Sequence, residues 1–262
     1  MAGVSLPLAP QRTFGKTSRP DRWWIQPAIV FTGLSLFILY STWAAFQGAH
    51  YEYGPYLSPM YSPVLWGDSE HAIFGKVPSW WPSWAPYSPA FLILWAPAGF
   101  RLTCYYYRGA YYKAFWADPL NCAVGEPRKG YIGESNWPLK IMNIHRYFFY
   151  LAALFILMLT IDAIKAFFFK DGFGIGVGTL VLCLNVFLLG GYTFGCHSLR
   201  HLIGGRKDCM SESPSCLKAY NACTALNHRH MLFAWTSLIV VGFSDIYIRM
   251  CSLGIWHDYR VL

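Results

Sequence analysis

The chain has 262 residues, of which 55% are hydrophobic and only 13% are charged. Soluble domains carry nearer a quarter charged residues, so this composition, with a mean hydropathy of +0.30, excludes an ordinary soluble enzyme and indicates a polytopic membrane protein with sizeable loops. The net charge of +8 is not gathered into a basic tail, so membrane topology explains it better than nucleic-acid binding does.

We predict an all-α fold, because five apolar stretches approach the roughly 20 residues that a membrane-spanning helix needs. A polar segment, residues 1–25, precedes them and should stay in the cytoplasm. Residues 26–255 should form a five-helix membrane domain, and residues 256–262 an extracytoplasmic C-terminal tail. The predicted spans cover residues 28–46, 89–104, 144–163, 173–196 and 231–248.

Two of these spans contain residues that shape a helix. The second span is the shortest, and Pro97 should kink it because proline lacks a backbone N–H and clashes with the preceding turn. The fourth span begins with Gly174, Gly176 and Gly178. Glycines at this spacing should allow another helix to approach closely.

The distribution of Lys and Arg gives the orientation of the spans. With the N-terminus inside, sixteen of the 21 Lys and Arg residues fall on inside segments and five fall outside. Cytoplasmic loops carry an excess of these residues. The asymmetry therefore predicts five spans with a cytoplasmic N-terminus.

The two long loops differ in composition. Residues 47–88 are rich in Pro, Tyr and Trp, and we predict an extracytoplasmic cap loop that lies on the outer surface. Residues 105–140 mix Tyr with Arg and Lys. A surface of this kind next to a membrane favours a docked protein subunit or a lipid headgroup over nucleic acid.

Cysteine and histidine gather where the spans meet the cytoplasmic side. Five of the eight histidines fall there in the predicted topology, together with Cys104 at the end of span two, Cys122 in the next loop and Cys196 at the end of span four. Ionisable groups at membrane depth usually serve a function. The five histidines are His145, His197, His201, His228 and His230.

Several interpretations of this cluster stay open at this point. Two Cys and two His can hold zinc or, as in a Rieske-type centre, a [2Fe–2S] cluster, and two facing His can hold a haem. A metal-free alternative is that these histidines pack at the interface or meet lipid phosphates beside Arg146, Arg200 and Arg229. The chain has no CxxC or CxxCH spacing, and it has no Walker, GxGxxG, GxSxG or HExxH motif.

Five stretches of the sequence resemble a known family. They read GPYLSPMYSP, CYYYRGAYYKAFW with NCAVGEPRKGY, NIHRYFFYLA, GCHSLRHLIGG and LNHRHMLFAW. With these motifs, residues 26–255 resemble the membrane-anchor subunit of bacterial succinate dehydrogenase (complex II), in the branch with a single five-span anchor. The resemblance implies a multi-pass protein of the bacterial inner membrane that docks the flavoprotein and iron–sulfur subunits and passes electrons to menaquinone or another quinone.

The resemblance also implies a redox centre in the anchor. A Rieske-type [2Fe–2S] cluster is associated with this branch, while many other anchors hold haem b. The family pattern leads us to expect a second Cys at position 199, where this chain has Leu199, and this shifts the prediction toward Cys104 and Cys122. The ligand candidates are Cys104, Cys122, Cys196, His145, His197, His201 and His230.

A quinone pocket should lie beside such a centre. Aromatic side chains at the membrane interface are its candidate walls, namely Tyr107, Trp137, Tyr147 and Trp235. Basic residues of the inside loop should help to dock the iron–sulfur subunit, namely Arg108, Lys113, Arg128 and Lys129. The alternative function is a non-redox membrane scaffold or a small-solute transporter.

Overall fold

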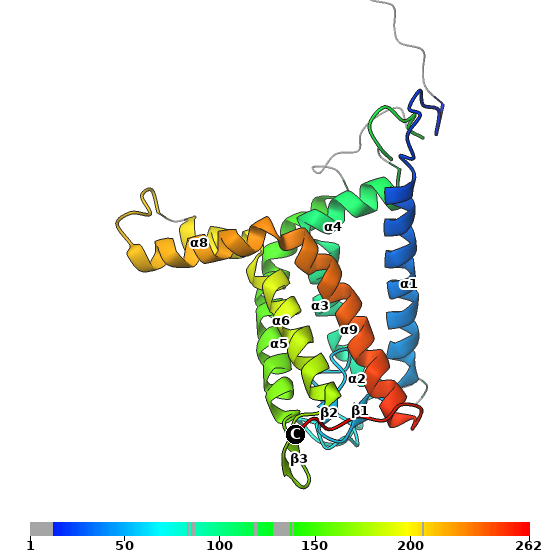
Figure 1. Cartoon of the computed structure of the whole chain (residues 1–262), viewed down its shortest axis with the longest axis vertical. Helices are drawn as coiled ribbons and strands as arrows, with labels where there is room; N and C mark the ends of the chain where they lie inside the picture. Colours follow the sequence, from blue (N-terminus) through cyan, green and yellow to red (C-terminus); the bar gives the residue numbers. More distant parts are fainter. Residues whose placement is uncertain are drawn as a thin grey trace, which may run out of the picture.

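The computed structural model of this chain describes residues 13–82, 84, 87–117, 120–127, 137, 139–205 and 207–262. Within these ranges 4 helices are long and apolar enough to cross a membrane. They run roughly along the long axis of the molecule as one bundle (Figure 1). They are α1 (Ile25–Gln47), α5 (His145–Lys165, extended to Lys140 by a 3₁₀ turn), α6 (Val177–Phe194) and α9 (His230–Ser252).

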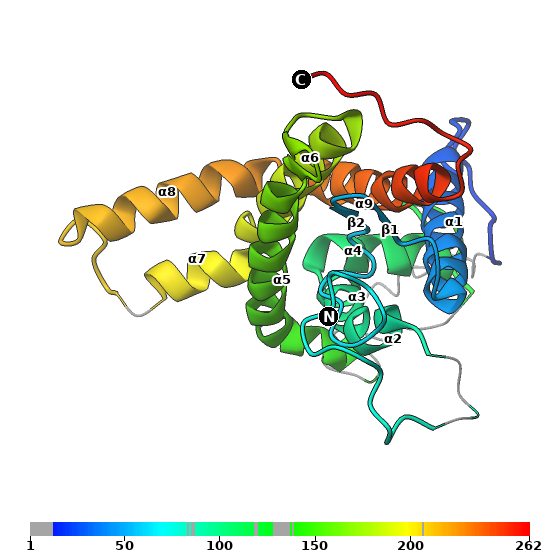
Figure 2. The same cartoon turned by 90° about the horizontal axis from the view of Figure 1, so that it is seen from below.

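Shorter elements occupy the two ends of this bundle. At the end where α1, α5 and α9 begin, which we call the Cys/His end, lie α4 (Tyr105–Ala110), a π-helical turn (Tyr111–Phe115), the 3₁₀ turn (Leu139–Ile144), α7 (His197–Gly204) and α8 (Pro214–His228). At the opposite end, the hairpin end, lie the antiparallel pairs β1 (Glu52–Tyr53) with β2 (Tyr56–Leu57), and β3 (Phe168–Phe169) with β4 (Gly172–Phe173). Helices α7 and α8 run side by side away from the bundle (Figure 2).

The helical membrane architecture is confirmed, but the count of five spans is not. Residues 89–104 do not form one helix: α2 (Pro89–Ile93) and α3 (Trp95–Leu102) are separated at Leu94. The interruption lies one turn before Pro97, which cannot donate a hydrogen bond to the carbonyl of Ile93. At 1.5 Å per residue the two helices together cover about 20 Å, which is shorter than the roughly 30 Å hydrocarbon core.

The segment before α2 folds into the bundle, so the prediction of a cap loop lying on the outer surface is not confirmed. Tyr56, Tyr61 and Val64 are all 0% exposed. Tyr61 and Val64 belong to a core cluster that also includes Ala44 and Ala45 of α1, and Tyr56 belongs to a second cluster with residues of α5, α6 and α9. Aromatic and apolar side chains of the loop therefore fill the space that a shortened second helix leaves.

Polar groups of this inserted loop find partners on the long helices. Ser58 donates a hydrogen bond to the carboxylate of Asp245 on α9, and Ser62 donates one to Asp162 on α5. Irregular backbone at membrane depth is tolerated only where protein surrounds it and satisfies its polar groups. The two carboxylates within the spans therefore serve to bind the inserted loop.

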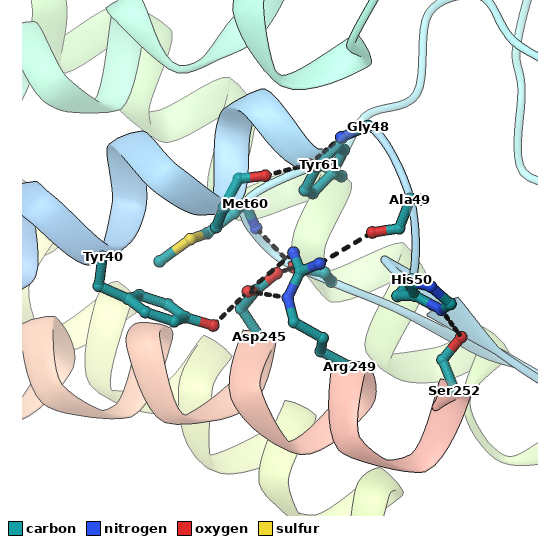
Figure 3. Close-up of polar contacts among 11 residues, drawn as sticks. Tyr40, Gly48, Ala49, His50, Met60, Tyr61, Asp245, Arg249 and Ser252 are labelled. Atoms are coloured by element: carbon teal, nitrogen blue, oxygen red, sulfur yellow. Dashed lines mark hydrogen bonds and ion pairs between the residues drawn. The ribbon is translucent and has the colours of Figure 1, made fainter. Parts of the chain in front are cut away.

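Asp245 also forms a buried ion pair with Arg249, one turn along α9. The carboxylate is 0% and the guanidinium 2% exposed, and both Nε and Nη2 of Arg249 lie 3.3 Å from Asp245 Oδ2. The hydroxyl of Tyr40 on α1 donates to the same oxygen at 2.6 Å, and Arg249 Nη1 donates to the carbonyl of Ala49 at 2.9 Å. Figure 3 shows these side chains converging between α1, the loop and α9.

Glycines permit close contacts at the hairpin end. Gly48 has a φ of 58° and ends α1 in the left-handed conformation, and its N–H donates to the Tyr61 hydroxyl at 3.1 Å. Gly178 lies against Tyr56, where a Cβ would be 2.5 Å from the ring. The predicted close approach to the glycine run of span four thus occurs, but the neighbours are the β1–β2 hairpin and the C-terminal residues rather than another helix.

Replacing Asp245 by Ala should destabilise the fold, because Arg249 would remain buried without a counter-charge. Removing one partner of a buried ion pair costs about 3–5 kcal/mol. We expect a lower thermal midpoint of unfolding, measured on the purified protein in detergent. The matched control is Asp171→Ala, which removes the exposed partner of Arg260 and should leave the midpoint close to that of the parent. Equal shifts for both variants would contradict this role of the buried pair.

Candidate metal centre

Two thiols and two imidazoles meet inside the Cys/His end of the bundle. His145 Nε2 lies 3.1 Å from Cys196 Sγ, and Cys104 Sγ lies 3.9 Å from His230 Nε2. Cys104, Cys196 and His230 are each 2% exposed, and His145 is half-buried. The structure therefore brings four of the seven predicted ligand candidates together.

Each of these four side chains sits where a helix starts. Cys104 and Cys196 are extended residues that precede α4 and α7, and His145 and His230 are the first residues of α5 and α9. A break in the helix at both cysteines turns the chain across the end of the bundle. The four donors thus come from four separate chain segments at one depth, which no single helical motif could supply.

Neighbouring side chains fix the orientation of both imidazoles. Thr103 Oγ1 lies 2.9 Å from His145 Nδ1, and the ring of Phe100 stacks on His145 with centroids 4.7 Å apart. The ring of Tyr192 stacks on His230 with centroids 4.9 Å apart. Partners of this kind hold a ligand imidazole so that one chosen nitrogen faces the metal.

The second nitrogen of His230 has no hydrogen-bond partner among the described residues. His230 Nδ1 is buried and lies beside Gly195, where a Cβ would be 3.1 Å away. An unpaired buried polar atom costs free energy. Because Nε2 is the nitrogen that faces Cys104, Nδ1 is left against the backbone at the end of α6.

The donors are arranged as two Cys–His pairs rather than as one set around a point. Among the residues that the structure describes, no three or more His, Cys, Asp or Glu side chains surround a position for a single metal ion. Thiolate and neutral imidazole are ligands for zinc, iron–sulfur clusters and other soft or borderline metals.

The other three ligand candidates lie elsewhere. Cys122 is exposed, in a segment that pairs with the N-terminal residues, where Arg19 Nη1 donates to its carbonyl at 3.0 Å. His197 and His201 are exposed on α7, where they line a groove together with Arg200 and Tyr220. Burial lowers the pKa of His197, and the positive charge of neighbouring Arg200 lowers it further.

The sequence reasoning missed residues that surround the four donors. Four side chains contact the imidazoles, namely Thr103, Phe100, Tyr106 and Tyr192. Of these, only Thr103 could have been predicted from the sequence to lie at the site, because it directly precedes Cys104. Arg101 also went unassigned, although a single cation within an apolar stretch is a recognisable signal.

A cavity of about 180 Å³ adjoins the site between α1, α4 and α9. Two of the predicted quinone residues, Tyr107 and Trp235, line it, whereas Trp137 and Tyr147 are 76% and 58% exposed and are not part of its lining. The lining also includes Tyr106, whose ring centroid lies 4.9 Å from that of His230. One aromatic ring thus separates the cavity from the thiol–imidazole set.

The fold and the site together define a multi-pass helical membrane protein with a buried thiol–imidazole set at one end. The family model of actinobacterial succinate dehydrogenase subunit SdhC matches residues 25–254. The chain belongs to this family, and the prediction of a succinate dehydrogenase membrane-anchor subunit is confirmed.

A solved structure supports the same assignment. The chain is similar to a chain in a structure described as the Mycobacterium smegmatis Sdh1 complex in the apo form, with 42% sequence identity, a TM-score of 0.88 and 100% of both chains covered. No curated protein matches the chain.

Burial should separate the cysteines in a thiol-alkylation experiment. Cys209 is exposed, and a hydrogen bond with Ser211 lowers the pKa of its thiol, which raises the thiolate fraction at a given pH. Iodoacetamide should therefore modify Cys209 within the folded protein and leave Cys104 and Cys196 untouched until unfolding, as measured by mass spectrometry of peptides.

The matched control for this experiment is Ser211→Ala. It removes the hydrogen bond, so the pKa of Cys209 should rise and its alkylation near neutral pH should slow. Modification of Cys104 or Cys196 in the folded protein at the rate of Cys209 would contradict the burial described above.

Proposed function

We propose that this chain anchors the flavoprotein and iron–sulfur subunits of succinate dehydrogenase to the membrane and passes their electrons to a membrane quinone. The observation that carries the proposal is the position of the buried thiol–imidazole set beside the cavity, with Tyr106 between them. Family membership supports the assignment to succinate dehydrogenase. The two neighbouring sites support the proposed path of electrons through this subunit.

The residues present fit a Rieske-type [2Fe–2S] cluster as the redox centre. Such a cluster takes two Cys and two His ligands, and Cys104, Cys196, His145 and His230 supply that number and these types. When bound, it would accept and release one electron at a time. The protein residues hold the donors buried, orient the imidazoles through Thr103 and the stacked rings, and keep bulk water away.

Haem b, the alternative cofactor, fits these residues less well. A haem b would be held by two histidines that both bind its iron, and His145 and His230 would be those residues. Here the Nε2 atoms of His145 and His230 each lie close to a thiol, and aromatic rings stack on both imidazoles. The donor set therefore favours iron–sulfur chemistry.

The cavity is the proposed quinone pocket. Its lining is largely apolar and aromatic, with a few polar groups such as Gln26, Lys113 and Asn121. Ligand sites of this kind hold an apolar ring and orient it through a small number of polar contacts. Tyr107 supports the wall, because its hydroxyl donates to the Ala234 carbonyl at 2.6 Å and accepts from Arg101 at 2.8 Å.

The soluble subunits are proposed to dock at the Cys/His end, facing the cytoplasm of the bacterial cell. The excess of Lys and Arg on this side supports the orientation. Lys113 lines the cavity at this end, whereas Arg108 is only 8% exposed and stacks over Tyr105, which suits a packing role better than a docking role. Arg128 and Lys129 lie outside the described residues.

Single ligand substitutions should remove the metal and leave the fold intact. In the complex purified with its soluble subunits, Cys104→Ser and His230→Ala should each abolish the EPR signal of a Rieske-type centre and reduce quinone reductase activity to background, with unchanged helical circular dichroism. The matched controls are Cys122→Ser and His201→Ala, which change the same residue types at exposed positions. Unchanged quinone reduction in Cys104→Ser and His230→Ala would favour the non-redox scaffold instead.

A larger side chain at Gly109 should block the quinone without disturbing the metal. Gly109 lines the cavity, and a Cβ there meets no atom within 4 Å, so Gly109→Leu can fold and fill the space. We expect KM for the quinone to rise about tenfold, equivalent to about 1.4 kcal/mol of lost binding. Tyr147→Ala, on the exposed face of α5, is the control. A normal KM in Gly109→Leu would mean that the quinone binds elsewhere.

A further inference from the structure

Arg101 is a half-buried cation within the bundle, close to the proposed centre. It lies in the last turn of α3, and its carbonyl accepts a hydrogen bond from the N–H of Cys104 at 3.2 Å. Its guanidinium donates to the Tyr107 hydroxyl at 2.8 Å, to the Ala234 carbonyl at 3.1 Å and to Ser237 Oγ at 2.9 Å. All three acceptors are uncharged.

Among the residues that the structure describes, no carboxylate therefore neutralises the charge of Arg101. None of the ion pairs between described residues includes it, in contrast to Arg249, which is paired with Asp245 at the other end of the bundle. An unpaired cation at membrane depth is expensive, and such residues usually serve a function. Neither the proposed ligand set nor the proposed quinone contacts account for this charge.

The guanidinium of Arg101 lies over an aromatic ring that stacks on a proposed ligand. Its central carbon lies 4.8 Å from the centroid of the Tyr192 ring, and that ring stacks on the His230 imidazole at 4.9 Å. Arg101, Tyr192 and His230 thus form a continuous series of contacts. Charges in such a water-poor site act on one another more strongly than they would in water.

We propose that Arg101 is a positioning charge that raises the reduction potential of the centre held by Cys104, Cys196, His145 and His230. The inference rests on the proposed function. Adding one electron to the centre adds one negative charge, which the fixed guanidinium stabilises; no bond forms or breaks. The electron comes from the iron–sulfur subunit and leaves to the quinone, so a higher potential favours its arrival at the Cys/His end.

The test is the midpoint potential of the centre, measured by EPR-monitored redox titration of the complete complex. Arg101→Gln removes the charge and should lower the potential. Ser237→Asp keeps Arg101 but places a carboxylate beside it, and should lower the potential as well. We expect at least a tenfold change in the ratio of reduced to oxidised centre at a fixed potential, which is about 59 mV for a one-electron couple.

Matched controls separate charge from packing. Ser237→Asn has nearly the same shape as Ser237→Asp but no charge, and should leave the potential close to that of the parent. Arg146→Gln removes a cation next to His145 in sequence, but this guanidinium is exposed over the Tyr147 ring and solvent screens it. It too should have little effect.

Each outcome decides one of the two proposals. A parent signal whose potential is the same in Arg101→Gln and Ser237→Asp would overturn the role of Arg101 and leave the centre itself in place. A parent complex without any [2Fe–2S] signal would overturn the proposed function, and this inference with it. If Arg101→Gln fails to assemble, the comparison of Ser237→Asp with Ser237→Asn decides the question alone.

Discussion

The fold depends on satisfying polar groups inside a membrane-spanning bundle that also encloses an irregular loop and two short helices. In lipid, unpaired backbone and side-chain groups have no water to bond. The carboxylate of Asp245 satisfies three such groups, because it binds Ser58, Tyr40 and Arg249. Asp162 does the same for Ser62. Asp245 and Asp162, two carboxylates within apolar helices, thus allow the loop before α2 to pack inside the bundle.

The interruption of the helix after Leu102 also shapes the Cys/His end. Because α3 stops at Leu102 and α4 turns across the bundle, Cys104 lies at a corner and its thiol faces His230 on α9. In a straight helix through residues 89–110, Cys104 would lie within the helix rather than at a corner between two helices. The same argument applies to Cys196, where α6 ends and α7 leaves the bundle sideways. The joints between helices are what bring thiols and imidazoles together.

Sequence alone could predict the long spans and the end at which Cys and His gather, because apolar length and the position of Lys and Arg carry that information. It could not separate His145 and His230 from His197 and His201. The helical spacing of four residues pairs His197 with His201, but the change of direction at Cys196 puts both on an exposed arm. The prediction of a second span over residues 89–104 was not confirmed for a similar reason. The loop before it is held by contacts from residues distant in sequence, such as Asp245.

The arginines at the two ends of the bundle differ in whether a described carboxylate pairs with them. At the hairpin end, Arg249 is matched by Asp245, so the pair contributes to the fold and has little field left to act on anything else. At the Cys/His end, the described residues around Arg101 offer it neutral acceptors and aromatic faces. A protein that needed Arg101 only for packing could neutralise it in the same way. A positive charge that no described carboxylate neutralises, at the same end of the bundle as the two buried thiols, is the arrangement expected if the site holds an additional electron, as we propose.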